Sequence, residues 1–281
     1  MSDFGGSNYV MEGVLGLAGA AVLYLALGSF ALLHTYINRL EANRVDLLPI
    51  TYSMSGGVRQ VIQNPNDKDK ARTVTPSSNE ITGIEFSYSF FINVSQQAFD
   101  SGKQNFLTHI FHKGSPGQYP LLGPGVYMHK NINTLRVYMN SYDTWNNYAE
   151  VSNFPINKWV HVTIVCRSMH LEIYINGNIS SRLGFKISAP YQNYGDVYAF
   201  SNAKPTPPNS GMPSLEGDES FKIDGACQGL LSRLAYFNYA LSYSEINSLM
   251  NEGPSKTMDN TQSGPATNYL TDNWWTADFS Q

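Results

Sequence analysis

Cysteine is scarce in this chain, which has only Cys166 and Cys227 among its 281 residues. A scaffold held by several disulfides is therefore excluded, and so is a zinc site made of closely spaced cysteine pairs. We expect both residues to be buried thiols. The sequence also lacks a glycine-rich phosphate loop and any motif typical of an activated nucleophile.

Charge is also sparse. Charged residues make up 14% of the chain, the net charge is −4, and the 18 Lys and Arg are scattered rather than clustered. Proteins that bind nucleic acid usually carry a basic patch, so we expect no nucleic-acid partner. The 18 tyrosines instead favour a β-rich domain whose polar surface is made largely of Asn, Ser, Thr and Tyr.

A long apolar run is the most informative feature that is present. Val14 to Leu33 reads VLGLAGAAVLYLALGSFALL, and no charge lies between Glu12 and Arg39. Twenty helical residues span roughly 30 Å, which is the thickness of the hydrocarbon core of a bilayer. We therefore predict a transmembrane helix over residues 13–38, preceded by a short N-terminal segment, 1–12.

A cleaved signal peptide is the main alternative for this run. It would need basic residues ahead of a shorter apolar stretch, whereas Asp3 and Glu12 precede this one. Lys and Arg near a span tend to stay in the cytoplasm, and here Arg39 and Arg44 follow it. We therefore predict a retained anchor, single-pass, with the C-terminal domain on the cytoplasmic side. Two glycosylation patterns, at Asn93 and Asn178, argue for the other side, but such short patterns often arise by chance.

The sequence after the helix predicts an antiparallel β-sandwich. We expect a juxtamembrane linker at 39–57, a sandwich at 58–253 and an aromatic tail at 254–281. Apolar residues alternate with polar ones in Phe86–Val94 and again in Leu135–Met139. The strongest signal is a hairpin, whose strands 160–166 and 171–175 are joined by four residues. Many strands without a βαβ rhythm favour a sandwich.

One short helix is predicted near the end of the sandwich. Ser242 and Glu245 form a capping box, Leu241 and Ile246 fit the flanking hydrophobic staple, and Gly253-Pro254 ends the helix.

Several of these pieces together resemble a known family. Trp159–Val165 and Leu171–Gly177 resemble the central hairpin of laminin-G-like and pentraxin-like domains, which are concanavalin A-like jelly rolls. The opening strand, a segment ending in Lys113-Gly114 and a closing strand that leads into the capped helix follow the family order. This resemblance covers roughly residues 58–253 and implies an all-β concanavalin A-like (laminin-G-like) sandwich.

The resemblance raises the question of enzymatic activity, because some members of the family are glycoside hydrolases with a Glu-x-Asp-x-x-Glu strand. The nearest match, Glu216, Asp218 and Glu219, has Phe221 at the last position and lies in a Pro- and Gly-rich stretch, so we expect solvated loop carboxylates and no enzyme. His109 and His112, three residues apart in a predicted strand, are expected to point to opposite faces. His161 matches the structural histidine of the family, which implies a packing role.

Family members often bind Ca²⁺ or glycans at one rim of the sandwich. Oxygen ligands for Ca²⁺ are available at five positions, although the same residue types dominate ordinary turns; they are Asp143, Asn146, Asn147, Asp196 and Asn202. We predict no resident cofactor, with Ca²⁺ as the alternative. Tyr142, Trp145 and Tyr148 are candidates for an aromatic glycan platform, or for packing and protein interfaces.

The tail contains Trp274, Trp275 and Phe279, which either anchor in the groove of a partner or fold back on the sandwich. The whole layout is similar to virion membrane proteins of large icosahedral DNA viruses, whose minor capsid components link an internal membrane to the shell. The resemblance implies a non-enzymatic structural protein whose partners are the bilayer and neighbouring capsid or membrane-associated proteins. The alternative is a membrane-anchored lectin or adhesion receptor that binds glycans.

Overall fold

The computed structural model describes residues 6–67, 71–77, 83–205 and 221–259. The chain divides into two compact units, Met1–Arg44 and Val45–Gln281. The described part of the first unit is almost entirely one helix, α1 (Gly6–Ala42). By length and composition α1 could cross a membrane, although a signal sequence passes the same criteria.

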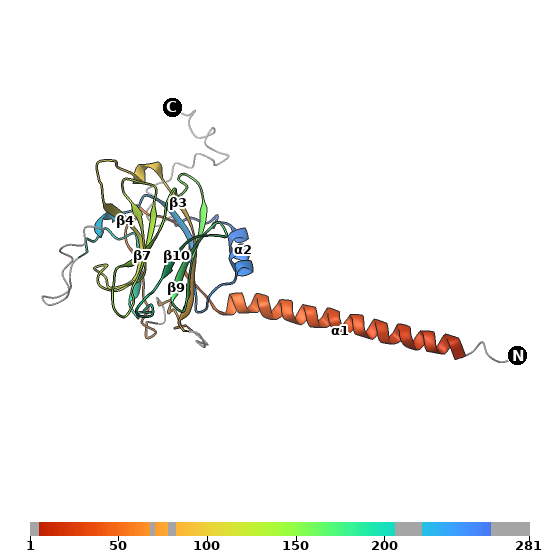
Figure 1. Cartoon of the computed structure of the whole chain (residues 1–281). Coiled ribbons are helices and arrows are strands. Elements are labelled where there is room, and N and C mark those ends of the chain that lie inside the picture. Colours follow the sequence, from red (N-terminus) through yellow and green to blue (C-terminus); the bar gives the residue numbers. More distant parts are fainter. Residues whose placement is uncertain (1–5, 68–70, 78–82, 206–220, 260–281) are drawn as a thin grey trace, which may run out of the picture. The chain divides into compact units, whose positions relative to one another are not determined.

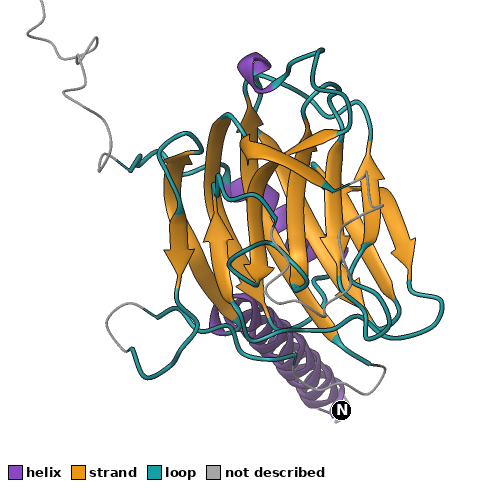
Figure 2. Cartoon of the chain, turned by 90° about the vertical axis from the view of Figure 1, so that its left-hand side faces the viewer, coloured by secondary structure: helices purple, strands orange, loops and turns teal. Residues whose placement is uncertain are grey.

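The second unit is a sandwich of two β-sheets, whose strands run side by side in Figure 2. Among the described residues, one sheet has six strands in the order β1 (Arg44–Ser53), β13 (Gly229–Phe237), β3 (Glu85–Val94), β8 (Val160–Arg167), β9 (His170–Ile175) and β10 (Asn178–Gly184). The second described sheet has seven, in the order β2 (Arg59–Val61), β11 (Asp196–Ala199), β4 (Phe106–Gly114), β5 (Leu122–His129), β6 (Leu135–Met139) and β7 (Asn147–Val151), with β12 (Lys222–Ala226) paired parallel to β4. A short 3-10 helix, η1, covers Gln96–Ala98.

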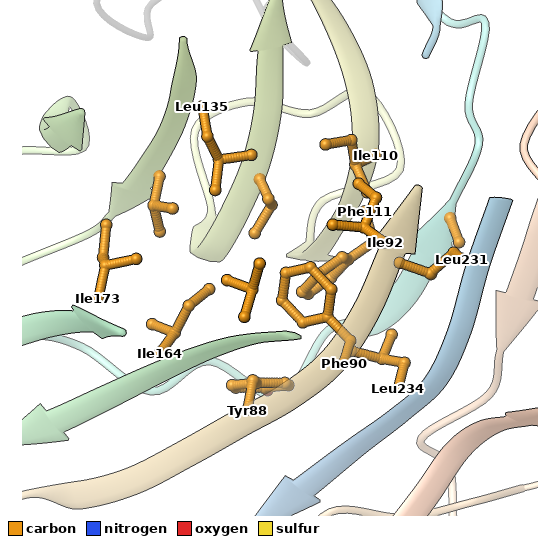
Figure 3. Close-up of a cluster of buried hydrophobic side chains, with 14 of the residues drawn as sticks. Tyr88, Phe90, Ile92, Ile110, Phe111, Leu135, Ile164, Ile173, Leu231 and Leu234 are labelled. Atoms are coloured by element: carbon orange, nitrogen blue, oxygen red, sulfur yellow. The ribbon is translucent and has the colours of Figure 1, made fainter. Parts of the chain in front are cut away.

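The core lies between the two sheets and is built from alternating strand residues. The predicted hairpin is confirmed, because β8 and β9 pair antiparallel with Ile164 opposite Ile173. Both side chains are fully buried, and they lie in one core cluster with Phe90 of the same sheet and Leu135 of the facing sheet (Figure 3). The period of two in these strands thus places one face of each strand in the core.

The central strands β3 and β8 of the six-stranded sheet are buried on both faces, whereas the sequence predicted a half-buried strand at Phe86–Val94. The polar side of β3 is covered by the chain that follows β13, since the Ser87 hydroxyl donates to Tyr239 O and accepts from Leu241 N. Helix α2 (Tyr243–Glu252) follows and lies alongside this sheet (Figure 1). Its predicted capping box, between Ser242 and Glu245, is present.

The sandwich begins earlier than predicted, because most of the expected linker 39–57 is strand β1. Leu47, Leu48 and Met54 are buried in the core, and Met54 N donates to Gly229 O across to β13. The sequence RVDLLPITYS has no strict period of two, so strand periodicity did not reveal it.

The two ends of the sandwich are defined by different segments of the chain. At one end, Arg72 in the segment after β2 donates to Asp46 O, near the start of β1, and β4 ends at Gly114 opposite Asp196. The opposite end, one strand length away, holds the turn between β5 and β6 with Ile132. We call these the cleft end and the far end.

Candidate functional site

A cleft of about 800 Å³ opens at the cleft end. Its walls come from three stretches: the segment after β2, the start of β3, and the loop between β10 and β11. Tyr142, from the turn after β6, and Lys113, from β4, complete the described lining. Segments far apart in the sequence therefore form one site.

Lys113 holds one wall of the cleft in place. Its ammonium donates to the carbonyls of Asn193 at 2.7 Å and Gly195 at 2.8 Å, and the side chain is almost completely buried. Burial lowers the pKa of Lys113 to about 8, and the nearby carboxylate of Asp196 opposes that shift. With its protons directed at backbone oxygens, Lys113 acts as a clamp on the loop between β10 and β11.

The amide side chains around the cleft are also committed to internal hydrogen bonds. Gln63 donates to Arg72 O and accepts from Val74 N, while Gln192 donates to the Tyr236 hydroxyl and accepts from Ser77 N. The remaining lining is largely apolar and rich in proline, and includes Pro65, Val74, Pro76, Ile84 and Pro190. This chemistry suits an apolar or amphipathic ligand better than a densely hydroxylated one.

A second cluster lies on the outer face of the seven-stranded sheet. The Tyr138 ring contacts Trp145, Tyr148 and Phe221, with centroids 5.1 to 6.3 Å apart. The Arg136 guanidinium lies 4.3 Å from the Tyr148 ring centroid, a cation–π contact. The predicted alternation of β6 is confirmed, because Val137 faces the core while its neighbours face this cluster.

A carboxylate in this cluster is held by two basic side chains. Glu150 Oε1 lies 2.7 Å from His129 Nε2 and accepts from Arg136 Nε at 2.8 Å. Burial raises the pKa of Glu150, but these bonds outweigh burial and leave that pKa below its usual value. Glu150 is therefore an ionised partner in an ion pair, not a protonated acid.

The three predicted glycan-platform residues fall in two places. Tyr142 projects at the cleft end, where its ring contacts Tyr191. Trp145 and Tyr148 instead belong to the cluster around Tyr138, in which Trp145 is half-buried. The platform stays a prediction, and the ring of Tyr142 contacts a different tyrosine from the one that Trp145 and Tyr148 contact.

The predicted Ca²⁺ ligands are engaged within the chain. Asp143 accepts from the hydroxyls of Ser141 and Ser188, and Asp196 accepts from Gln60 and Gln63. Asn202 accepts from Ala226 N. Among the described residues, no group of three or more His, Cys, Asp or Glu is arranged to hold a metal ion.

The prediction that His109 and His112 point to opposite faces is wrong. A β-bulge in β4 shifts the register between His109 and Phe111, so that Ile110 and Phe111 both enter the core. Both imidazoles consequently lie on the outer face, with His109 Nε2 2.8 Å from His112 Nδ1. In an ideal strand, residues three positions apart point to opposite faces. The extra residue of the bulge places His109 and His112 on the same face instead.

The hydrogen bonds around this pair define both tautomers. Ser201 N donates to His109 Nδ1, so His109 carries its proton on Nε2 and donates to His112. His112 Nε2 in turn donates to Ser115 O. Burial, and the proximity of the other ring, hold the pKa of His109 well below its usual value, and burial lowers the pKa of His112 to about 4. The pair is therefore neutral at physiological pH.

His161 packs against Phe91, with ring centroids 4.8 Å apart, and its Nε2 lies 2.9 Å from the Ser89 hydroxyl. Cys166 and Cys227 are both buried, and burial raises the pKa of the Cys227 thiol to about 11. Several predicted residues lie outside the described residues, namely Glu216, Asp218, Glu219, Trp274, Trp275 and Phe279.

Two facing sheets flanked by a short helix, with a cleft at one end, define a lectin-type β-sandwich. Residues 67–247 match the concanavalin A-like lectin/glucanases superfamily. The chain belongs to this superfamily, as its central hairpin and capped helix predicted. No curated protein sequence matches the chain at a significant level.

Solved structures with a similar fold include parts of botulinum neurotoxins. The receptor binding domain of the C/D mosaic serotype is 14% identical with a TM-score of 0.44, covering 60% of this chain and 36% of that one. A second structure of that domain, with a tetraethylene glycol molecule and a sulfate ion, is 14% identical with a TM-score of 0.48, covering 75% and 45%. The serotype C1 binding domain is 19% identical with a TM-score of 0.40, covering 60% and 36%. The chain thus spans less than half of each, and the likeness concerns the fold alone.

Proposed function

We propose that this chain is a membrane-anchored, non-enzymatic interaction protein, in which a concanavalin A-like sandwich is tethered to a bilayer by helix α1. One observation carries the proposal: the uncharged stretch between Glu12 and Arg39 lies in a helix that ends at Ala42, and the sandwich begins at Arg44. A folded binding domain follows the predicted span almost without a linker. The retained anchor is favoured over a signal peptide by the acidic residues ahead of the run.

A non-enzymatic role is supported by the state of the polar groups at the two candidate surfaces. Glu150 is held ionised by its ion pair with Arg136 and its hydrogen bond with His129, whereas a glycosidase needs one carboxylic acid opposed to a second carboxylate. Lys113 is clamped on backbone carbonyls rather than directed at the cleft. These groups stabilise the fold and leave apolar and aromatic surfaces for binding.

The finer proposal is that this interaction protein is a minor capsid component that links an internal virion membrane to a protein shell. It is supported by the predicted single-pass layout and by the aromatic cluster around Tyr138, in which the Tyr148 ring is exposed. The second candidate is a membrane-anchored lectin. The exposed ring of Tyr142 beside the cleft favours it, while the internally bonded amides of Gln63 and Gln192 argue against it.

The anchor can be tested by Leu23→Arg, which places a charge near the middle of the apolar run. An arginine at the centre of a span costs about 2.5 to 3.5 kcal/mol on insertion scales. We expect wild-type protein to stay in membranes washed with alkaline carbonate, and the variant to appear largely in the wash. Leu23→Phe, which keeps the residue apolar, serves as the matched control.

Mass spectrometry of the membrane-bound protein separates the anchor from the signal sequence. A retained anchor predicts that the mature chain still contains residues 14–33. Complete extraction of wild-type protein by carbonate, or a mature N-terminus after residue 33, would contradict the proposed anchor.

A further inference from the structure

Three large side chains at the cleft end are strongly exposed. Tyr142, Ile187 and Tyr194 are 72%, 83% and 82% exposed. Tyr142 and Tyr194 line the cleft, and Ile187 precedes Ser188, whose hydroxyl donates to Asp143 beside Tyr142. We call these three residues the apolar rim.

The loops that carry the apolar rim are firmly held. Asn193, next to Tyr194, is buried and donates to Lys113 O. Tyr142 N donates to Ala189 O, and Ser141 forms a β-bridge with Pro190. Rigid, buried neighbours thus present the rim side chains to solvent. Apolar groups grouped and exposed in this way commonly mark an interaction site.

The covalent chain joins the predicted span to this end of the sandwich through a short segment. Arg72, adjacent to the cleft residue Thr73, donates to Asp46 O, so the cleft end is tied to the first residues of β1. Asp46 follows Arg39, the first charge after the apolar run, by seven residues. Even fully extended, seven residues reach only about 25 Å.

The far end of the sandwich is more distant from the span along the chain. Strand β1 contains ten residues and runs from the cleft end toward Gly229, which lies at the far end. Ten strand residues extend roughly 33 Å. The chain therefore attaches to the predicted span at the end of the sandwich that carries the apolar rim.

We propose that the apolar rim docks on the surface of the bilayer in which α1 is anchored, with the two tyrosines and Ile187 inserted among the lipid headgroups. This inference rests on the proposed membrane anchor. Tyrosine is favoured at membrane interfaces because its ring is apolar and its hydroxyl remains hydrated. The largely apolar cleft between the tyrosines then faces lipid rather than water.

The charges near the apolar rim indicate which lipid composition is suitable for testing the proposal. Lys186 and Arg72 are exposed on this end, but so is Asp143, whose hydrogen bonds with Ser141 and Ser188 lower its pKa. The mixed signs predict docking through apolar contact rather than through attraction to anionic lipid. Zwitterionic phosphatidylcholine vesicles are therefore the appropriate probe.

The experiment uses the full chain reconstituted in such vesicles and labelled at a single introduced cysteine. Ile187→Cys places an environment-sensitive fluorophore on the rim, and Ile132→Cys places the same fluorophore at the far end on an isoleucine that is 49% exposed. Cys166 and Cys227 are both 0% exposed and should not react. Lipids that carry a nitroxide at the headgroup should quench the fluorophore at position 187 several-fold more strongly than the fluorophore at 132.

A second comparison separates docking from simple tethering. Replacing Tyr142 and Tyr194 together by serine should reduce quenching at position 187 several-fold, whereas Tyr243→Ser, at an exposed tyrosine on α2, should leave it unchanged. Equal quenching at positions 187 and 132 would overturn the proposal. So would strong quenching at 187 that the double tyrosine variant does not change. Failure of the anchor itself is a distinct outcome, because the labelled protein would then not float with the vesicles.

Discussion

Lowering the pH from about 7 to about 5 is expected to reduce the free energy of unfolding of the sandwich by about 4 kcal/mol. The cause is the burial of neutral histidines. Burial lowers the pKa of His112 and of His161 to about 4, from an ordinary value of 6.5. Each contributes roughly 2 kcal/mol over this interval, a large part of the stability of a typical domain.

The sign follows from proton binding. Between pH 6.5 and about 4, the unfolded chain binds protons at these positions and the folded chain does not. The stabilisation is therefore complete above pH 6.5 and is lost progressively as the pH falls toward 4. His109 acts in the same direction, because burial and its contact with His112 hold its pKa well below the usual value.

Urea unfolding of the intact chain in detergent, followed by tyrosine and tryptophan fluorescence at both pH values, measures this loss. His161→Gln should remove roughly 2 kcal/mol of the pH dependence, because glutamine does not titrate while its amide can still bond to Ser89. An unfolding free energy that is the same at both pH values would contradict the neutral buried state of these imidazoles.

The histidine pair also shows where the sequence could not predict the site. Strand periodicity correctly placed Val137 and Ile173 in the core, because a regular strand alternates its faces. The same rule failed at His109 and His112, since one bulge residue in β4 reverses the alternation. The stretch HIFH, from His109 to His112, contains no glycine or proline that would locate the bulge.

The cleft was not predicted because its walls meet only after folding. Among the lining residues, Gln63 and Tyr194 lie more than a hundred positions apart in the sequence, with Ile84 between them. No sequence motif connects these residues. The Lys113-Gly114 pattern indicates the family but not the role of the lysine, because the carbonyls that its ammonium contacts come from a loop about eighty residues later. Strand periodicity does not reveal β1, because both of its faces carry apolar residues and the composition next to the helix favours a linker.

The six-stranded sheet should be most sensitive at its central hairpin. Ile173→Ala is expected to lower the free energy of unfolding by about 2 to 5 kcal/mol, because it removes three carbons from a fully packed interior and leaves a cavity. Ile173 is 0% exposed, opposite Ile164 and in the same cluster as Phe90. The cost lies toward the upper part of that range if the facing sheet cannot move inward to fill the space.

A matched control exists on the next strand. Ile179→Ala makes the same chemical change in β10, where the side chain is 56% exposed, and should cost less than about 1 kcal/mol. Glu172→Ala would be a poorer control, because that carboxylate accepts from the Tyr174 hydroxyl and pairs with Arg167. The two alanine variants should be compared by urea unfolding at pH 7, where the buried histidines contribute fully. Similar losses for Ile173→Ala and Ile179→Ala would mean that β9 does not direct Ile173 into the core, and the register of the whole hairpin would have to shift by one residue.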